Sequence, residues 1–325
     1  MRLVKHPVLC NYYVTYRCNA SCDFCDIWEK PSPYVTFDDV QKNLLDLKKL
    51  GVKVIDFTGG EPLLHREIVD FLDEAKKLGF ITTLTTNTLL YPKLSEKLVE
   101  KIDMLHFSLD YASAEKHDAV RGVGCFQFVL DSIKQAKSLG ERPDILMTVF
   151  DENFDEIEKI YRQIVMPNNL VLLLNPVFDY NNVENHGGLS HENLLKLKKW
   201  AKKPNVYLNE AFIDLRLDGG NKINNPICKA ASTTVVISPE NELLIPCYHL
   251  GEKALKINKN LLKLFSSNEA LTARNQEGRL ESCEGCVINC YMQPSFAVNI
   301  NKYWFKALPS TLKYARLKGT WKQLF

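Results

Sequence analysis

The sequence predicts an α/β protein built around a parallel sheet. Short apolar runs of strand length alternate with segments whose apolar residues recur at helical spacing, and this alternation covers the first two thirds of the 325 residues. Six such strands separated by helices indicate βα units joined by right-handed crossovers, which is the arrangement of a partial (β/α)6 barrel. In such a barrel, functional groups belong at the carboxyl ends of the strands.

The expected elements follow one another closely along the chain. Buried strands are expected at residues 8–15, 52–57, 80–86, 104–109, 145–150 and 170–174. Helices are expected at residues 38–50, 67–78, 93–101, 126–139, 154–165 and 191–201. In the first of these helices, Leu44, Leu47 and Leu50 recur at helical spacing, and Thr36 is placed to cap the amino end.

A polar, glycine-containing stretch at residues 181–190 interrupts this pattern, as expected at a domain junction. The length of the chain also suggests about two domains. We therefore expect the barrel at residues 1–180 and a linker with a helix at 181–227. A small domain of a β-hairpin and helices is expected at 228–295, and a tail at 296–325.

The overall composition excludes several classes of protein. The formal net charge is only +2, so no basic field indicates a nucleic-acid partner. The first residues lack the apolar region and cleavage site of a signal peptide, and no stretch reaches the ~18 apolar residues that span a bilayer. Ten cysteines in a long, well-patterned chain indicate thiols that bind metal rather than secreted disulfides, and we expect a cytoplasmic protein.

The loop after the first strand carries three cysteines in the order C-x3-C-x2-C, namely Cys18, Cys22 and Cys25. A [4Fe–4S] cluster normally takes one thiolate per iron, so three cysteines leave the fourth iron open to an outside ligand. The alternative is a zinc site formed by these thiolates with Asp23, Asp26 or a distant histidine. Zinc would not account for the glycine-containing turn that follows the second strand.

That turn reads Gly59, Gly60, Glu61 and Pro62. Two glycines let the backbone approach a ligand closely, and the adjacent carboxylate can receive an ammonium group. Together with the cysteine triplet, the G-G-E-P segment resembles the radical S-adenosylmethionine (radical SAM) superfamily. The resemblance implies that the open iron binds the amino and carboxylate groups of SAM, and that G-G-E-P holds the amino group. It also implies reductive cleavage of SAM to a 5′-deoxyadenosyl radical, which abstracts hydrogen from a substrate.

Further residues near the strand ends suit the same cofactor. Beyond G-G-E-P, the residues expected to bind SAM are Ile27, Trp28, Asn87, Ser108, Asp110 and Arg121. The resemblance places Ile27 and Trp28 near adenine and lets Arg121 meet the SAM carboxylate. The side chains of Ser108 and Asp110 suit ribose hydroxyls, while ordinary turn chemistry is an equal alternative for Asn87 and Ser108.

A second set of cysteines lies in the last third of the chain and comprises Cys228, Cys247, Cys283, Cys286 and Cys290. The first two flank a predicted β-hairpin, and the other three form C-x2-C-x3-C. The arrangement resembles the twitch or SPASM extension of some radical SAM enzymes, which holds auxiliary [4Fe–4S] clusters. Five thiols suffice for one such cluster with one to spare, and the spacing leaves open which is spare. A structural zinc site would accept the same four thiolates.

The tail combines basic and aromatic residues. Residues 285–325 contain no aspartate or glutamate, but they include six lysines and arginines among aromatic side chains. This composition is typical of a segment that meets anionic lipid at a membrane surface. The alternative is a helix docked across the barrel mouth with its lysines outward. Ser310 is placed to cap a short helix that Gly319 ends.

The sequence therefore predicts a radical SAM enzyme with an auxiliary cluster that modifies an unidentified small molecule, lipid or peptide, in an oxidation or a related reaction. The reductant is expected to be a protein such as flavodoxin or ferredoxin. A chain that starts almost at its first strand disfavours modification of ribosomal peptides, unless a separate partner delivers them. Two alternatives are a membrane-surface enzyme acting on a lipid or isoprenoid, and a non-catalytic iron–sulfur or zinc protein. No general base is predicted among the mouth residues Asn175, Asp179 and Tyr180.

Overall fold

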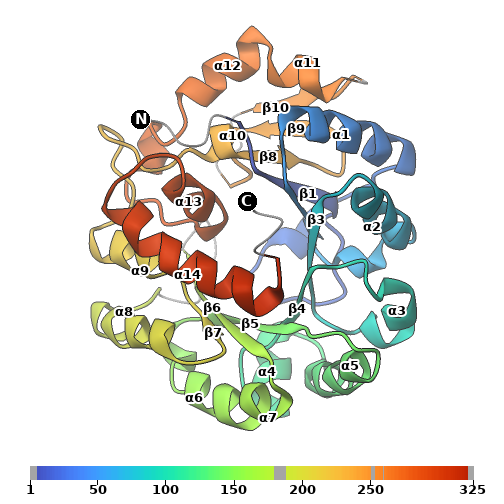
Figure 1. The fold of residues 1–325 in the computed structure, drawn as a ribbon, viewed down its shortest axis with the longest axis vertical. Coiled ribbons are helices and arrows are strands. Elements are labelled where there is room, and N and C mark those ends of the chain that lie inside the picture. Colours follow the sequence, from blue (N-terminus) through green and yellow to red (C-terminus); the bar gives the residue numbers. More distant parts are fainter. Residues whose placement is uncertain (1–5, 179–187, 250–252, 259, 321–325) are drawn as a thin grey trace.

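The computed structural model describes residues 6–178, 188–249, 253–258 and 260–320. Within them, one ten-stranded sheet runs in the order β10-β9-β8-β1-β2-β3-β4-β5-β6-β7 (Figure 1). The parallel strands of the barrel are β1 (Leu9–Thr15), β2 (Val54–Gly59), β3 (Ile81–Thr86), β4 (Met104–Ser108), β5 (Asp144–Val149) and β6 (Val171–Pro176). Their order in the sheet equals their order in the sequence, which confirms the predicted partial barrel of βα units.

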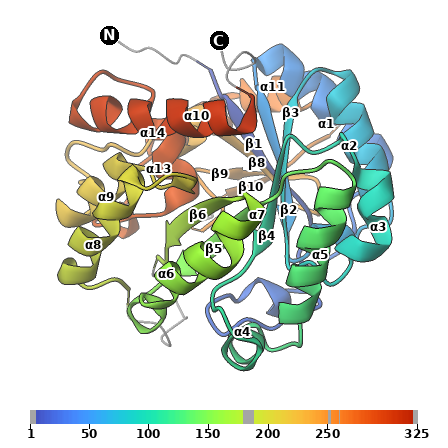
Figure 2. The same cartoon turned by 60° about the horizontal axis from the view of Figure 1, so that its bottom comes forward.

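Helices follow the barrel strands, and most of them cover the outer face of the sheet (Figures 1 and 2). They are α1 (Phe37–Leu50), α2 (Ile68–Lys77), α3 (Tyr91–Leu98), α4 (Ala114–Arg121), α5 (Phe126–Ser138), α6 (Glu156–Ile160) and α7 (Met166–Asn168). Helix α1 begins as predicted, because the Thr36 side chain accepts a hydrogen bond from Asp39 N at 3.2 Å. It ends at Gly51, whose φ of 89° favours glycine.

Two helical regions differ from the prediction. Helix α4 was not expected, because its buried positions include the polar residues His117 and Arg121 and the segment therefore lacks an apolar period. The helix expected at residues 154–165 consists of α6 followed by a π-helical turn (Tyr161–Val165). The predicted junction at 181–190 falls mostly outside the described residues, so the domain limits stay a prediction.

The remaining elements extend this frame. Strand β7 (Val206–Tyr207) adds to β6, and the predicted hairpin of β8 (Thr234–Ile237) and β9 (Glu242–Ile245) joins the other edge of the sheet. β8 pairs in parallel with β1, and β10 (Lys253–Lys256) follows β9. The further helices are α8 (His191–Lys198), α9 (Glu210–Leu217), α10 (Ala230–Thr233), α11 (Leu261–Phe265), α12 (Asn268–Asn275), α13 (Asn289–Phe296) and α14 (Lys302–Lys318).

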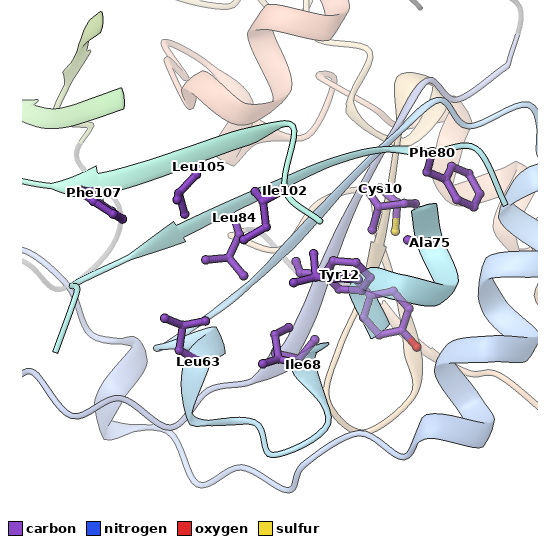
Figure 3. Packing of buried hydrophobic residues seen from close by; sticks show 14 of the residues in the cluster. Cys10, Tyr12, Leu63, Ile68, Ala75, Phe80, Leu84, Ile102, Leu105 and Phe107 are labelled. Carbon is purple, nitrogen blue, oxygen red and sulfur yellow. The ribbon is translucent and has the colours of Figure 1, made fainter. Parts of the chain in front are cut away.

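Successive side chains of a strand point to opposite faces of the sheet, so the apolar residues form two clusters, one on each face. On the outer face, Tyr12 belongs to the large cluster that packs on the surrounding helices (Figure 3). Phe57 belongs to the same cluster, and its ring lies 6.2 Å from the Phe71 ring of α2. On the inner face, Tyr13 belongs to a second cluster with Met292 of α13. Helix α13 therefore packs inside the curve of the sheet.

The tail forms α14, which crosses the amino ends of the strands, at the opposite end of the barrel from α4 (Figure 2). Tyr314 Oη lies 2.7 Å from Asp144 Oδ2 and 3.1 Å from His106 Nε2, and Lys318 Nζ lies 3.0 Å from Asp144 Oδ1. The helix ends at Gly319 as predicted, but the predicted cap was wrong, because Asn301 caps a longer helix that contains Ser310. No helix among the described residues is long and apolar enough to cross a membrane.

Candidate functional site

The three cysteines of the first motif lie in the loop that follows β1. Cys22 is buried, while Cys18 and Cys25 are half-buried. The loop is held to the carboxyl end of α4 by a hydrogen bond from Ser21 N to Arg121 O at 3.1 Å. Burial raises the pKa of Cys18 to about 11, and the charges of the other two thiols contribute to the rise. The three sulfurs are therefore close enough for the charge of Cys22 or Cys25 to affect the pKa of Cys18.

Gly59 and Gly60 pack directly on the backbone that leads into this loop. A Cβ atom at Gly59 would overlap the carbonyl oxygen of Thr15, and one at Gly60 would overlap that of Arg17. Gly59 also has a φ of 147°, which side chains rarely permit. This approach lets Gly60 N donate to Thr15 O and Glu61 N donate to Arg17 O, both at 2.9 Å. Backbone contacts thus join the two sequence motifs into one site.

Glu61 connects this turn to β3. Its side chain is 1% exposed, and Oε1 accepts hydrogen bonds from Leu63 N (3.0 Å) and Thr86 Oγ1 (2.9 Å). Oε2 accepts from Asn87 N at 2.8 Å. Burial raises the pKa of Glu61 to about 7, although these donors and the charge of Arg121 act to lower it. A carboxylate oxygen has two lone pairs, so Oε2 retains capacity for one further donor.

Asn87 lies between β3 and the cysteine loop. Its Nδ2 donates to Asn19 Oδ1 at 2.7 Å and lies 4.0 Å from Cys18 Sγ. Its Oδ1 accepts from Leu89 N at 3.1 Å, so Asn87 also stabilises a turn. Ser108 is buried at the carboxyl end of β4.

Arg121 and Asp110 form a buried ion pair beside the cysteines. Asp110 Oδ2 lies 2.7 Å from Arg121 Nε and 2.6 Å from Nη2, and Asp110 Oδ1 accepts from Thr148 N at 2.9 Å. The third guanidinium nitrogen, Nη1, lies 3.8 Å from Cys22 Sγ. Burial raises the pKa of Cys22, and the positive charge of Arg121 opposes that rise. The arginine therefore favours a thiolate at this position.

The other predicted residues lie on turns around this centre. Ile27 is buried and Trp28 is 40% exposed, both on a 3₁₀ turn after the third cysteine. Pro62 is buried and begins a second such turn. The ring centroids of Phe24 and Phe150 lie 6.2 Å apart.

The donor set matches a cubane cluster with one open iron. Three cysteines share the loop, and N–H groups of Arg121 and Asn87 approach the sulfurs of Cys22 and Cys18, as expected for groups that tune a cluster. A cubane takes each thiolate at a different iron, so three thiolates leave one iron open.

Four of the five C-terminal cysteines line one enclosed hollow. They are Cys228, Cys247, Cys283 and Cys286. Gly278 closes one side, and a Cβ atom there would lie 3.1 Å from Cys228 Cβ. Cys290 is not among the lining residues and lies on α13. Burial raises the pKa of Cys290, with smaller contributions from Cys247 and Asp56.

Asp56 is a candidate site residue that the motifs do not reveal. Ile55 and Phe57 belong to the outer core, so Asp56 points to the inner face of β2. In the sheet it lies beside Asn11 of β1 and Thr83 of β3. Burial raises the pKa of Asp56 to about 7, and no hydrogen bond or ion pair reaches its carboxylate within the described part of the chain. In the sequence, the only indication of this site residue was a carboxylate within an otherwise largely apolar strand.

Comparison with protein families identifies the barrel. The model described as "Radical SAM superfamily" matches residues 12–164, which contain both motifs and the Asp110–Arg121 pair. Residues 12–164 therefore form a radical SAM domain. The curated relatives of this chain are enzymes, in agreement with the predicted enzymatic function.

Two of these relatives are about one third identical to this chain over an aligned stretch of about half its length. GTP 3′,8-cyclase of Peptoclostridium acidaminophilum is 34% identical over 155 residues, which are 45% of this chain and 48% of that protein. AdoMet-dependent heme synthase of Methanosarcina barkeri is 30% identical over 165 residues, which are 49% of this chain and 47% of that protein. The chain described here thus matches about half the length of each of these relatives.

Solved structures show the same fold over a longer part of the chain. SuiB of Streptococcus suis, bound to precursor peptide SuiA, has a TM-score of 0.67 at 18% identity and covers 81% of this chain and 65% of its own. The structure of anSMEcpe with bound AdoMet has a TM-score of 0.64 at 17% identity and covers 98% of this chain and 100% of its own. The second likeness therefore extends over nearly the whole chain.

Proposed function

We propose that this radical SAM enzyme binds SAM at a [4Fe–4S] cluster held by Cys18, Cys22 and Cys25, and uses it to abstract hydrogen from a substrate. When bound, the reduced cluster and SAM supply a 5′-deoxyadenosyl radical. The observation that carries this proposal is the packing of Gly59 and Gly60 on the backbone of the cysteine loop. This packing holds the glycine-containing turn beside the loop of the three thiols, as one shared cofactor site requires.

Side chains around the cysteine loop would position SAM by hydrogen bonds and charge. Oε2 of Glu61 has a lone pair left for a hydrogen bond from the ammonium group, and Arg121 has N–H groups beyond those that bind Asp110. Because Asp110 is fully buried and paired with Arg121, it acts by positioning Arg121 rather than by holding ribose. Ile27 and Trp28 remain the proposed neighbours of adenine, with Asn87 and Ser108 as polar contacts.

We further propose a second [4Fe–4S] cluster in the hollow lined by Cys228, Cys247, Cys283 and Cys286, with Cys290 as the spare thiol. The reconstituted protein should then hold about eight irons. Cys290→Ser should keep that number, while Cys247→Ser should lower it to about four. Loss of iron in the Cys290 variant would contradict the assignment, and four irons with one bound zinc would indicate a structural zinc site.

The inner face of the barrel suggests the chemistry of the substrate. Asp56 is half-buried, and a carboxylate partly removed from water without a partner is stabilised by a ligand that supplies a donor or a positive charge. Asp56 therefore supports a substrate with an amine or amide group, and would repel a triphosphate placed beside it. A peptide meets this requirement, and SuiB and anSMEcpe have been solved with peptides bound.

The lipid alternative depended on the tail, and the basic residues of α14 have other roles in the fold. Lys302 Nζ lies 2.7 Å from Asp218 Oδ2, and Lys313 donates to Ala201 O at 2.8 Å. Lys318 pairs with Asp144. We therefore propose that α14 closes the amino end of the barrel, and we expect the full-length protein not to bind anionic vesicles at low salt.

SAM binding at the cluster can be tested without knowing the substrate. The electron paramagnetic resonance spectrum of the anaerobically reduced protein should change when SAM is added, because SAM would bind an iron directly. Cys22→Ala should abolish this change, while Cys290→Ser should retain it. A wild-type spectrum that ignores saturating SAM would refute the proposed function.

A further inference from the structure

A basic hollow of about 620 Å³ lies between α10, α12 and the start of β1. Its charged lining residues are Lys229, Arg274, Arg279 and Glu277, which gives three cations and one carboxylate. Glu277 is 7% exposed, and its carboxylate accepts hydrogen bonds from Ser232 N and Ser232 Oγ, both at 2.8 Å. The acidic group is thus turned inward, while Arg279 is exposed at the surface.

Two short segments form the wall between this hollow and the auxiliary cysteines. In one, Cys228 lines the cysteine site and the next residue, Lys229, lines the basic hollow. In the other, Gly278 lines the cysteine site, and its neighbours Glu277 and Arg279 line the basic hollow. A single thickness of backbone therefore separates solvent-facing cations from a proposed cluster ligand.

The segment around Cys283 carries charges of both signs. Cys283 is flanked by Glu281 and Glu284, whose side chains are exposed. Glu284 lies 3.1 Å from Lys222 and accepts a hydrogen bond from Ile223 N, and Ile223 O lies 3.5 Å from Arg279 Nη1. The excess of positive charge lies in the hollow beside Lys229, where an acidic partner would be attracted.

We propose that the basic hollow docks an acidic one-electron carrier protein of the flavodoxin or ferredoxin class, which exchanges electrons with the auxiliary cluster through this wall. The inference rests on the proposed auxiliary cluster. The carrier loses or gains one electron as the cluster gains or loses one, so no other reactant is required. Opposite charges on the two surfaces accelerate encounter and fix the orientation of the carrier.

Calorimetric titration of oxidised flavodoxin into the reconstituted full-length protein tests this docking. The double variant Lys229→Glu/Arg279→Glu should raise the Kd at least about tenfold, and added salt should weaken binding to the wild type. The matched control is Lys97→Glu/Lys134→Glu, which makes the same charge change on α3 and α5, away from α12 (Figure 1). The control should bind flavodoxin like the wild type.

Iron content separates the two ways in which the proposal can fail. About eight irons with equal flavodoxin binding in both double variants would overturn the docking site alone. About four irons in the wild type would overturn the auxiliary cluster and the docking role with it. If the Lys229→Glu/Arg279→Glu variant loses affinity for inorganic phosphate but not for flavodoxin, the hollow is a small-anion site and the proposal is wrong.

Discussion

Replacing Gly60 with alanine tests the contact that joins the two motifs. The added Cβ would overlap the carbonyl oxygens of Tyr16 and Arg17, and backbone atoms cannot move aside as a flexible side chain can. Overpacking of this kind costs roughly 1–3 kcal/mol, and the bonds from Gly60 N and Glu61 N would lose about 1 kcal/mol each. We therefore expect the free energy of unfolding to fall by about 3–5 kcal/mol.

Urea denaturation of the metal-free protein measures this loss, and iron content after reconstitution measures its effect on the site. The matched control is Gly140→Ala, because Gly140 has a φ of 79° and nothing within 4 Å of the added Cβ. Backbone strain alone should cost the control roughly 1–2 kcal/mol and leave its iron content unchanged. Equal losses in the two variants, with full iron in both, would refute the proposed role of the contact.

Three further predictions concern the inner face and the amino end of the barrel. Tyr314→Phe should lower the free energy of unfolding by about 1–3 kcal/mol, measured in urea, because buried Asp144 and His106 lose a partner; an unchanged midpoint would contradict the docking of α14. Burial, and then the charge of Lys318, lowers the pKa of His106 to about 3, against about 6.5 in an unfolded chain. The unfolded chain therefore binds more protons between these values, so stability should fall as the pH is lowered through this range, and less steeply in His106→Asn. Asp56→Asn should leave iron content and substrate-free SAM cleavage unchanged, whereas loss of either would place Asp56 in the SAM site.

The sequence was most informative where function depends on short stretches of backbone. The spacing of Cys18, Cys22 and Cys25 places three thiols in one loop, and the G-G-E-P turn ends a strand that the apolar pattern already indicates. Both features are local, so they can be recognised without knowing what lies across the barrel. The strands and most outer helices were predictable for the same reason, because their apolar periods are local.

Contacts between distant segments were not predictable. The pairing of Arg121 with Asp110, for example, requires α4 to lie beside the end of β4. Likewise, the place of Cys290 depends on where α13 begins, and the six cations of the tail gave no indication that Lys318 would reach Asp144. Asp56 was visible in the sequence, but only the sheet shows that it points inward beside Asn11.

The release of 5′-deoxyadenosine tests the central claim most directly. Anaerobically reconstituted wild-type protein, given a reductant and SAM, should form 5′-deoxyadenosine, measured by liquid chromatography and mass spectrometry. Replacing Cys18, Cys22 and Cys25 together with alanine should abolish this product, while about four irons remain in the C-terminal site. Persistence of 5′-deoxyadenosine in the triple variant, or its absence from wild-type protein with a full complement of iron, would contradict the account.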